Sequence, residues 1–379
     1  MSIEALKDYV FTSKYSRYIP EKMRRETFPE AVERVIDMHR RHFASKGIDV
    51  EDLLQVCEQA MKQKMVLGSQ RAMQFGGEPI LRKHARIYNC TTSYCDRPRF
   101  FQEALWLLLC GCGVGFSVQT HHITKLPGIA KPGAANATYV IPDTIEGWAD
   151  ALGVLLSSYF STRQPFPEYA GTTVQFDYTQ IRPKGRPISS GMGRAPGPEP
   201  LRRSLEKIRE LLDKRLAEGH TRLRAIDAYD ILMHASDAVL SGGVRRSATI
   251  CLFSPEDDEM ATAKTGNWFT ENPQRARSNN SAMLLRDKTP REQFAKLMKS
   301  VKEFGEPGFV WTDHLDMTFN PCAEIGLYPQ IDGVSGFAFC NLCEINMGCV
   351  DNKEKFEAAC RAAAVLGTLQ AEYTDFGYL

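Results

Sequence analysis

Short apolar segments with the composition of β-strands alternate with helical segments along the middle of the chain. One helical segment reads "PRFFQEALWLLLCG", and Gly111 is a suitable C-terminal stop for it. A strand that ends at Cys90 is expected before this helix. Alternation at this spacing is typical of an α/β fold with a mainly parallel sheet. Strands are expected at residues 113–119, 172–178 and 244–253, and helices at residues 98–111, 144–160 and 225–243.

Size and composition restrict the class of protein. The chain has 379 residues, of which 43% are hydrophobic, so it can bury one large core or two medium ones. A net charge of +1 with evenly mixed signs argues against a dedicated nucleic-acid binder. The longest apolar stretch, residues 104–118, is shorter than the roughly 20 residues that cross a bilayer, and no apolar signal segment is seen. We expect a cytoplasmic protein that binds neither membrane nor nucleic acid.

Two further regions are distinctive. Residues 1–65 are polar and helical in pattern, and residues 28–43 predict an amphipathic helix opened by Pro29. Residues 182–200 form a Gly/Pro-rich loop that is too long and too rich in glycine for a simple connection. We expect this loop to have a binding role.

Eleven cysteines are many for a cytosolic protein. Their odd number, the chain size and the lack of a signal segment argue against a secreted, disulfide-stabilised protein. Buried thiols, a metal site and redox chemistry all stay open. Cys57, Cys251 and Cys360 lie in apolar helical or strand contexts, and we expect them to be buried thiols.

The segment "FNPCAEIGLYPQIDGVSGFAFCNLCEINMGCV", residues 319–350, places cysteines and glutamates among small and polar residues. Asn320, Cys322 and Glu324 are spaced two apart, so in an extended or looped segment their side chains point the same way. An amide, a thiol and a carboxylate in one small volume can bind a sugar diol, reach a C–H bond and move a proton.

Two other uses of these thiols fit the sequence less well. A structural zinc site usually needs four ligands, but Cys340 and Cys343 form the only C-x2-C pair, and Cys90 and Cys95 have a poorer spacing. No metal site is therefore predicted. A cysteine protease needs a base, conventionally a histidine, and His314 is the only close candidate.

The motifs "NPCAEI" and "FCNLCEI" resemble the active-site finger loop of ribonucleotide reductases, particularly the adenosylcobalamin-dependent, monomeric-type class II enzymes. Further segments resemble this family in the family's own order: "YSRYIPEK", "YNC", "GCGVGFSV", "PDTIEGW", "IRPKGRPISSGMGRAPGPEPL", "GGVRRSA", "RSNNSAM" and "GEPGFV". The resemblance to the large, catalytic subunit covers nearly the whole chain, and an ordered set of motifs is far more specific than any one of them.

The resemblance implies that the ribose 2′-hydroxyl of a ribonucleotide is replaced by hydrogen. Cys322 matches the thiyl-radical position that takes the 3′-hydrogen, and Glu324 matches the general base on the 3′-hydroxyl. Asn320 matches the residue that holds the substrate by hydrogen bonding. Cys90 and Cys340 match the dithiol that ends as a disulfide, so their Cα atoms must lie within roughly 4.4–6.8 Å. An external thiol reductant such as thioredoxin is implied as well.

The same resemblance implies sites for the substrate and for an effector nucleotide, a dNTP or ATP. The loop at about 241–249 resembles the loop between effector and substrate base, where arginines can stack on a base or bind phosphate. The loop at about 182–200 resembles the neighbouring effector loop, whose backbone amides can bind phosphate. The expected substrate contacts are Asn89, Gly113, Gly115 and Asn320. The expected effector contacts are Arg245, Arg246, Arg182, Asp96 and Asp177.

The implied fold is the α/β ten-stranded barrel of the ribonucleotide reductase and glycyl-radical superfamily, in which two five-stranded parallel half-barrels enclose the finger loop. Residues 1–65 are then an N-terminal helical region. Residues 66–379 are the first half-barrel, with the finger loop at about 319–345. The family's catalytic domain continues further, so we expect a complementary C-terminal half to complete the enzyme. No segment resembles an ATP-cone domain, and a homodimer is a further option.

Two classes of function stay open: a catalytic reductase part, or a non-catalytic remnant or nucleotide-binding regulatory protein. The five matched catalytic positions favour the first, because a binding-only protein has no chemical need for all five. Adenosylcobalamin is the favoured radical source, a separate metal-containing radical subunit is the alternative, and the formate-using glycyl-radical class ranks last. The sequence leaves open a diphosphate or a triphosphate substrate. The other cysteines, Cys95, Cys110, Cys112, Cys343 and Cys349, have no assigned counterpart and are expected to be structural.

Overall fold

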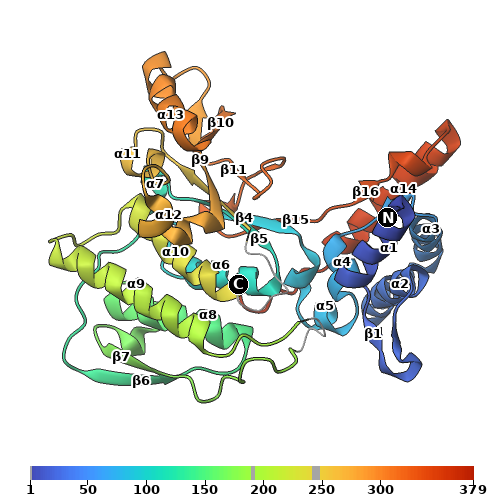
Figure 1. The fold of residues 1–379 in the computed structure, drawn as a ribbon, viewed down its shortest axis with the longest axis horizontal. Coiled ribbons are helices and arrows are strands. Elements are labelled where there is room, and N and C mark those ends of the chain that lie inside the picture. The colour runs from blue at the N-terminus through green and yellow to red at the C-terminus, as the bar shows by residue number, and fades with distance from the viewer. Residues whose placement is uncertain (1, 189–192, 241–247) are drawn as a thin grey trace.

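A mixed β-sheet forms the centre of the molecule (Figure 1). The computed structural model describes residues 2–188, 193–240 and 248–379. Within these ranges the largest sheet has six strands in the order β10-β9-β8-β5-β4-β15. Neighbours from β10 to β4 are parallel, and β15 is antiparallel to β4, so the expected α/β fold with a mainly parallel sheet is confirmed. The strands are β4 (Cys90–Tyr94), β5 (Gly113–Ser117), β8 (Thr249–Phe253), β9 (Ser278–Leu285), β10 (Gly308–Thr312) and β15 (Ala338–Cys340).

The five parallel strands equal the number expected for one half-barrel. Every residue of β4, β5 and β8 is buried, as is usual for parallel strands that are covered on both faces. The edge strand β10 instead alternates half-buried and exposed residues before its buried last residue. Closure of this sheet into a barrel stays a prediction.

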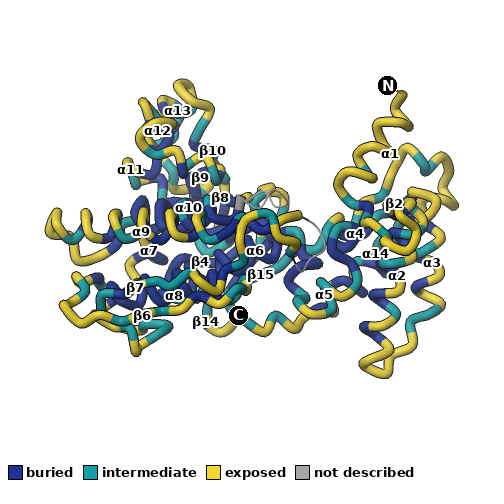
Figure 2. The backbone as a smooth tube through the Cα atoms, turned by 60° about the horizontal axis from the view of Figure 1, so that its bottom comes forward, coloured by how far each residue is buried: buried dark blue, intermediate teal, exposed yellow. Residues whose placement is uncertain are grey.

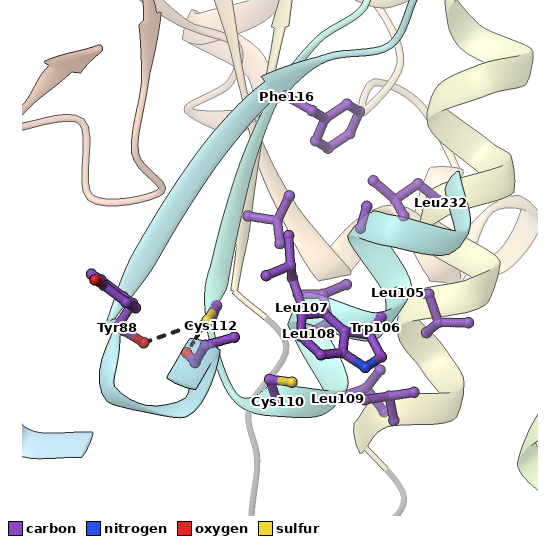
Figure 3. Packing of buried hydrophobic residues seen from close by; sticks show 14 of the residues in the cluster. Tyr88, Leu105, Trp106, Leu107, Leu108, Leu109, Cys110, Cys112, Phe116 and Leu232 are labelled. Carbon is purple, nitrogen blue, oxygen red and sulfur yellow. Dashed lines mark hydrogen bonds between the residues drawn. The ribbon is translucent and has the colours of Figure 1, made fainter. Parts of the chain in front are cut away.

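Helix α6 (Phe100–Cys110) occupies the core, and each of its residues is buried. It packs against β5, α8 (Ile145–Tyr159) and α10 (Ala225–Leu240), and α10 also packs against α9 (Glu199–Ala217). Figure 3 shows Leu107, Phe116 and Leu232 from three of these elements in one cluster. The helix ends at Gly111, whose φ of 101° is a left-handed conformation that suits glycine, so the expected stop is confirmed.

Two strands differ from the expectation. The strand at Cys90 begins there instead of ending there, because the β-branched and aromatic residues that follow continue the extended chain. The strand expected at residues 172–178 forms as β7 (Thr173–Asp177), but it pairs in parallel with β6 (Asn136–Val140) outside the central sheet. Half-buried and exposed residues alternate along β6, which suits a small sheet with one solvated face.

The first helices and the last helix lie together, to the right in Figure 1. α2 (Phe28–Ser45) begins after Thr27, which forms a reciprocal capping box with Glu30, and Pro29 lies in the first turn. α14 (Lys353–Ala371) packs against α3 (Glu51–Lys62), and β16 (Glu344–Ile345) pairs with β3 (Val66–Leu67). Figure 2 shows α1 (Ile3–Lys14) on the outside, and none of its described residues is buried. The chain thus returns to its N-terminal helices after leaving the sheet.

The remaining elements are short, apart from α13. The helices are α4 (Gln70–Phe75), α5 (Glu78–Arg82), α7 (Thr120–Ile123), α11 (Asp258–Ala261), α12 (Trp268–Glu271) and α13 (Arg291–Phe304). The 3-10 helices are η1 (Pro20–Lys22), η2 (His84–Ile87), η3 (Pro167–Tyr169), η4 (Pro273–Arg277) and η5 (Met347–Cys349). The strands are β1 (Tyr18–Ile19), β2 (Arg24–Arg25), β11 (Thr318–Phe319), β12 (Gly326–Leu327), β13 (Gln330–Ile331) and β14 (Val334–Ser335). Among the described helices, none is long and apolar enough to span a membrane.

Candidate active site

Cys90 and Cys340 form a directly opposed pair in the antiparallel ladder between β4 and β15. Directly opposed residues of such a ladder have Cα atoms about 4.5–5.5 Å apart, which lies within the roughly 4.4–6.8 Å that a disulfide spans. Both residues are buried, with 5% and 6% of their surfaces exposed. The sheet therefore brings the two predicted redox cysteines to bridging distance while keeping them from solvent.

A tight turn after β11 carries the other predicted catalytic residues. The backbone N–H of Ala323 donates to the carbonyl of Asn320 at 2.8 Å, and Ala323 has a left-handed φ of 63°. The buried Asn320 side chain accepts a hydrogen bond from the Ile325 N–H at 3.1 Å, and its Nδ2 lies 3.9 Å from the Sγ of Cys340. Asn320 thus shapes the turn and joins it to the dithiol.

Cys322 and Glu324 lie on the exposed side of this turn. Partial desolvation of the thiol is the largest cause that raises the pKa of Cys322 to about 11, and the negative charge of Glu324 acts in the same direction. The charge of Glu324 also acts on Cys340, so the carboxylate lies near both thiols. At neutral pH Cys322 is therefore a protonated thiol, the form that can give up a hydrogen atom.

The two opposed thiols have different acidities. A hydrogen bond with Cys340 and burial raise the pKa of Cys90 well above its usual value. The same hydrogen bond lowers the pKa of Cys340, although burial opposes this. The hydrogen bond between the two thiols therefore acts on their pKa values in opposite directions.

The predicted substrate contacts Gly113 and Gly115 lie on β5, next to the strand that carries the first cysteine. A Cβ atom on Gly115 would lie 2.0 Å from the carbonyl oxygen of Phe319, and one on Gly113 would lie 3.0 Å from Cγ of Pro321. The structure thus gives both glycines a packing role beneath the turn. Their contact with substrate stays a prediction.

Asn89, a further predicted substrate contact, is half-buried just before β4. Its side-chain oxygen accepts a hydrogen bond from the Ser69 hydroxyl at 2.7 Å, and its carbonyl accepts one from the Gly113 N–H at 2.8 Å. These bonds fix the start of β4 next to the dithiol. Asn89 is therefore close in the chain to the candidate site, but its side-chain oxygen already has a partner.

The predicted effector residues are not joined by the described contacts. Asp96 is buried and accepts a hydrogen bond from the Ser335 hydroxyl at 2.6 Å, which ties it to the finger loop. Arg182 donates from Nε to Asp143 at 2.6 Å, and Asp177 accepts from a backbone N–H within its own turn. Arg245 and Arg246, and residues 189–192 of the other effector loop, lie outside the described residues.

The remaining cysteines differ in burial. Cys57 and Cys251 are buried as expected, but Cys360 is only half-buried because α14 turns part of its surface to solvent. Of the cysteines expected to be structural, Cys95, Cys110 and Cys112 are buried, and Cys343 and Cys349 are half-buried.

A group of polar residues near the finger loop was not predicted. Gln119 donates from Nε2 to the carbonyl of Leu315 at 2.8 Å, and His121 and His122 both contact the carboxylate of Asp316. These residues hold the segment that contains Leu315 and Asp316, which leads into β11 and is called the stem of the finger loop below. The available signal was the motif "QTHH" directly after the buried strand, because polar residues at the carboxyl ends of parallel strands commonly form sites.

The fold corresponds to a known class of enzyme. A solved structure described as a B12-dependent (class II) ribonucleotide reductase matches 96% of this chain and 59% of its own with a TM-score of 0.77, at 23% sequence identity. The chain therefore has the fold of a class II ribonucleotide reductase.

Sequence comparisons agree with this fold. Residues 123–212 match a family model described as the insertion domain of B12-dependent ribonucleotide reductase, and this range contains α8, β6 and β7, which explains why β7 lies outside the central sheet. The adenosylcobalamin-dependent ribonucleoside-triphosphate reductase of Lacticaseibacillus paracasei is 28% identical over 78% of this chain and 47% of its own length. That of Levilactobacillus brevis is 26% identical over 87% of this chain and 53% of its own.

The chain spans about half the length of these relatives. Its resemblance to the adenosylcobalamin-dependent ribonucleotide reductases, which the motifs indicated, is confirmed by the family model, the relatives and the fold together.

Proposed function

We propose that this chain is part of an enzyme that reduces ribonucleotides to 2′-deoxyribonucleotides by a thiyl-radical mechanism. The observation that carries the proposal is the placement of Cys90 opposite Cys340, with the Asn320 side chain against Cys340. Cys322 lies on the same turn as Asn320 and is accessible from solvent. The names of the relatives favour a ribonucleoside triphosphate as the substrate.

Cys322 begins the chemistry. Loss of the hydrogen atom of its neutral thiol gives a thiyl radical, which takes the 3′-hydrogen of the ribose. Glu324 accepts the proton of the 3′-hydroxyl, for which it has to lie within direct or one-water reach. Asn320 orients the sugar by hydrogen bonding. Its side chain is buried and contacts both the Ile325 N–H and the Sγ of Cys340, and these two contacts hold it in one geometry.

The dithiol supplies the two electrons. The 2′-hydroxyl leaves as water with a proton from one thiol of the pair. As the S–S bond of Cys90 and Cys340 forms, the pair gives one hydrogen atom to C2′ and its remaining electron to the oxidised C3′, and Glu324 returns its proton to the 3′-oxygen. The C2′–O bond is thereby replaced by a C2′–H bond. Cys322 then returns its hydrogen atom to C3′, and an external dithiol such as thioredoxin reduces the disulfide for the next turnover.

The radical source we propose is adenosylcobalamin. Two features of Cys322 support such a source: the thiol is on the exposed side of the turn, and its raised pKa favours the protonated form at neutral pH. When bound, this cofactor supplies the radical that removes the thiol hydrogen. A separate metal-containing radical subunit is the alternative source, and it too needs an accessible thiol.

A complementary C-terminal part is included in the proposal. Strand β10 pairs only with β9 among the described residues, and its side chains Phe309 and Trp311 are 39% and 40% exposed. An unpaired edge with exposed aromatic side chains is a surface that another strand can cover. The relatives have a further part that this chain does not span. We expect that an equivalent part, supplied as a second polypeptide or as further chain, packs at this edge.

Control by a dNTP or ATP effector is the last part of the proposal. The loop at about 241–249 joins α10 to β8, and β8 is the direct neighbour of β5 in the sheet. An effector bound at this loop would thus be linked through one strand to the glycines beneath the turn.

Turnover with a supplied C-terminal half tests the function. The chain is combined with a complementary polypeptide, a dithiol and ribonucleoside triphosphates, with and without adenosylcobalamin, and deoxynucleotide is measured by mass spectrometry. Product that depends on the cofactor supports the proposal. Product that forms only after a metal-containing radical subunit is added, and not with the cofactor, points to that alternative source. Binding of dNTP without product in any combination would instead support the alternative, a nucleotide-binding regulatory protein.

A further inference from the structure

Two adjacent histidines and an aspartate meet at the stem of the finger loop. Nε2 of His121 lies 2.8 Å from Oδ1 of Asp316, and Nε2 of His122 lies 3.2 Å from the same oxygen. One ligand atom from each of the three residues lies within 4.8 Å of the others. His121 and His122 belong to α7, at the carboxyl end of β5, whereas Asp316 lies just before β11.

We propose that His121, His122 and Asp316 bind a divalent transition-metal ion of the zinc class. Imidazole nitrogens and a carboxylate oxygen are ligands of this ion, at distances of roughly 2.0–2.2 Å. Two ligand atoms at these distances around a tetrahedral ion lie about 3.3 Å apart. The observed separations of 2.8 and 3.2 Å therefore need only a small opening of the group to admit the ion.

The surroundings orient these side chains as the second shell of a metal site does. The buried His122 has its other ring nitrogen, Nδ1, 2.8 Å from the Ser117 hydroxyl. Its ring stacks on Tyr94, with centroids 4.1 Å apart, and the Tyr94 hydroxyl donates to the backbone carbonyl of Asp316. Partners of this kind fix the ring and leave Nε2 directed at the ion.

Charge and solvent access near the group both affect the binding of a cation. Lys125 lies one turn beyond the histidines and opposes a cation there. The buried carboxylate of Asp96, 3.9 Å from its ammonium group and shared with Arg97, offsets only part of this charge. His121 and Asp316 each keep 40% of their side-chain surface exposed, so an ion and a bound water can reach them. Three protein ligands with an open fourth position match this exposure.

The metal would act on the stem of the finger loop. Asp316 precedes Asn320 by four residues, and the ion would tie this segment to the end of β5, the strand that lies beneath the turn. The inference does not depend on the proposed reductase activity, because the ligands are distinct from the cysteines and from Glu324.

Metal binding to the purified chain tests the proposal. Zn²⁺ binding is measured by calorimetry and Co²⁺ binding by visible absorption, both on thiol-reduced protein. We expect a site with a nitrogen- and oxygen-type Co²⁺ spectrum, and we expect His121→Ala and Asp316→Asn to weaken its affinity by at least ~10-fold. His314→Ala removes an exposed histidine from the same segment and is the matched control, which we expect to bind like the wild type.

Two outcomes would overturn the inference. A thiolate-to-cobalt charge-transfer band would assign the ion to cysteines, and unchanged affinity in both ligand variants would exclude this site. Thermal unfolding in the presence of a chelator separates loss of binding from loss of folding. His121→Ala should unfold like the wild type without metal, but should lose the rise in melting temperature that added Zn²⁺ causes in the wild type.

Discussion

A Cβ atom on Gly115 would lie 2.0 Å from the carbonyl oxygen of Phe319. Gly115 is in the middle of β5, and Phe319 is the last residue of β11, directly before the turn that carries Asn320 and Cys322. The turn can therefore approach the dithiol only because β5 has no side chain at this position.

The first prediction is that Gly115→Ala displaces the turn. The new methyl group meets backbone, which cannot move aside like a flexible side chain, and overpacking of this kind costs about 1–3 kcal/mol of unfolding free energy. Urea denaturation measures the loss. Gly336→Ala is the control, because a Cβ there meets nothing within 4 Å, and equal stability of the two variants would contradict the packing.

The second prediction is that Cys322→Ser abolishes ribonucleotide reduction in the completed enzyme and leaves nucleotide binding nearly unchanged. The serine O–H bond is too strong to pass on a hydrogen atom, whereas its side chain has almost the size of cysteine. Turnover and calorimetric nucleotide binding are measured together. Cys343→Ser, which changes a half-buried thiol on the same loop, should retain turnover. Multiple turnovers by Cys322→Ser would contradict the assignment of Cys322 as the thiyl-radical position.

The third prediction is that one turnover without external reductant leaves a disulfide between Cys90 and Cys340. The two residues are already directly opposed, so the bond needs only side-chain rotation. Peptide mapping after alkylation of the remaining thiols identifies the bridge. A dominant bridge between Cys340 and Cys343 would point to a different redox site.

The fourth prediction concerns Arg245, which lies outside the described residues. Arg245→Ala should weaken the influence of the effector on substrate choice more than it weakens substrate binding, with a coupling energy of ~1–3 kcal/mol lost. Competition between two ribonucleotides, with and without dNTP, measures this coupling. If the wild type chooses substrates identically with and without effector, the loop has no such role.

The fifth prediction is a loss of stability in mild acid. Burial, with the charge of His42, lowers the pKa of His39 to about 3, whereas an unfolded histidine has a pKa of about 6.5. Below pH 6.5 the unfolded chain therefore binds more protons than the folded one. The contribution of His39 to the free energy of unfolding is fully present above pH 6.5. It falls by about 2 kcal/mol between pH 6.5 and 5.

Denaturation at several pH values measures how steeply the free energy of unfolding changes with pH, which is the slope meant below. His39 is completely buried and its Nδ1 lies 3.0 Å from the Tyr373 hydroxyl, so His39→Gln should flatten the slope even if it lowers stability at pH 7. The exposed His220 serves as the control, and His220→Gln should keep the wild-type slope. A slope that His39→Gln leaves unchanged would place the acid sensitivity elsewhere.

The sequence by itself determined the features that depend on neighbours in the chain. The apolar run of α6 and its glycine stop, the capped start of α2 and the buried strand at residues 113–117 follow from local patterns, and the structure has each of them. The residue types around Cys322 likewise indicated the chemistry, because an amide, a thiol and a carboxylate lie within five positions.

Only the tertiary structure decided which distant residues meet. Cys90 and Cys340 are 250 positions apart, and the register of β15 against β4 places them opposite each other. The pairing of β7 outside the central sheet and the meeting of α7 with Asp316 depend on packing in the same way. Such contacts are set by which surfaces of strands and helices cover one another, and a local pattern carries no information about the partner that covers it.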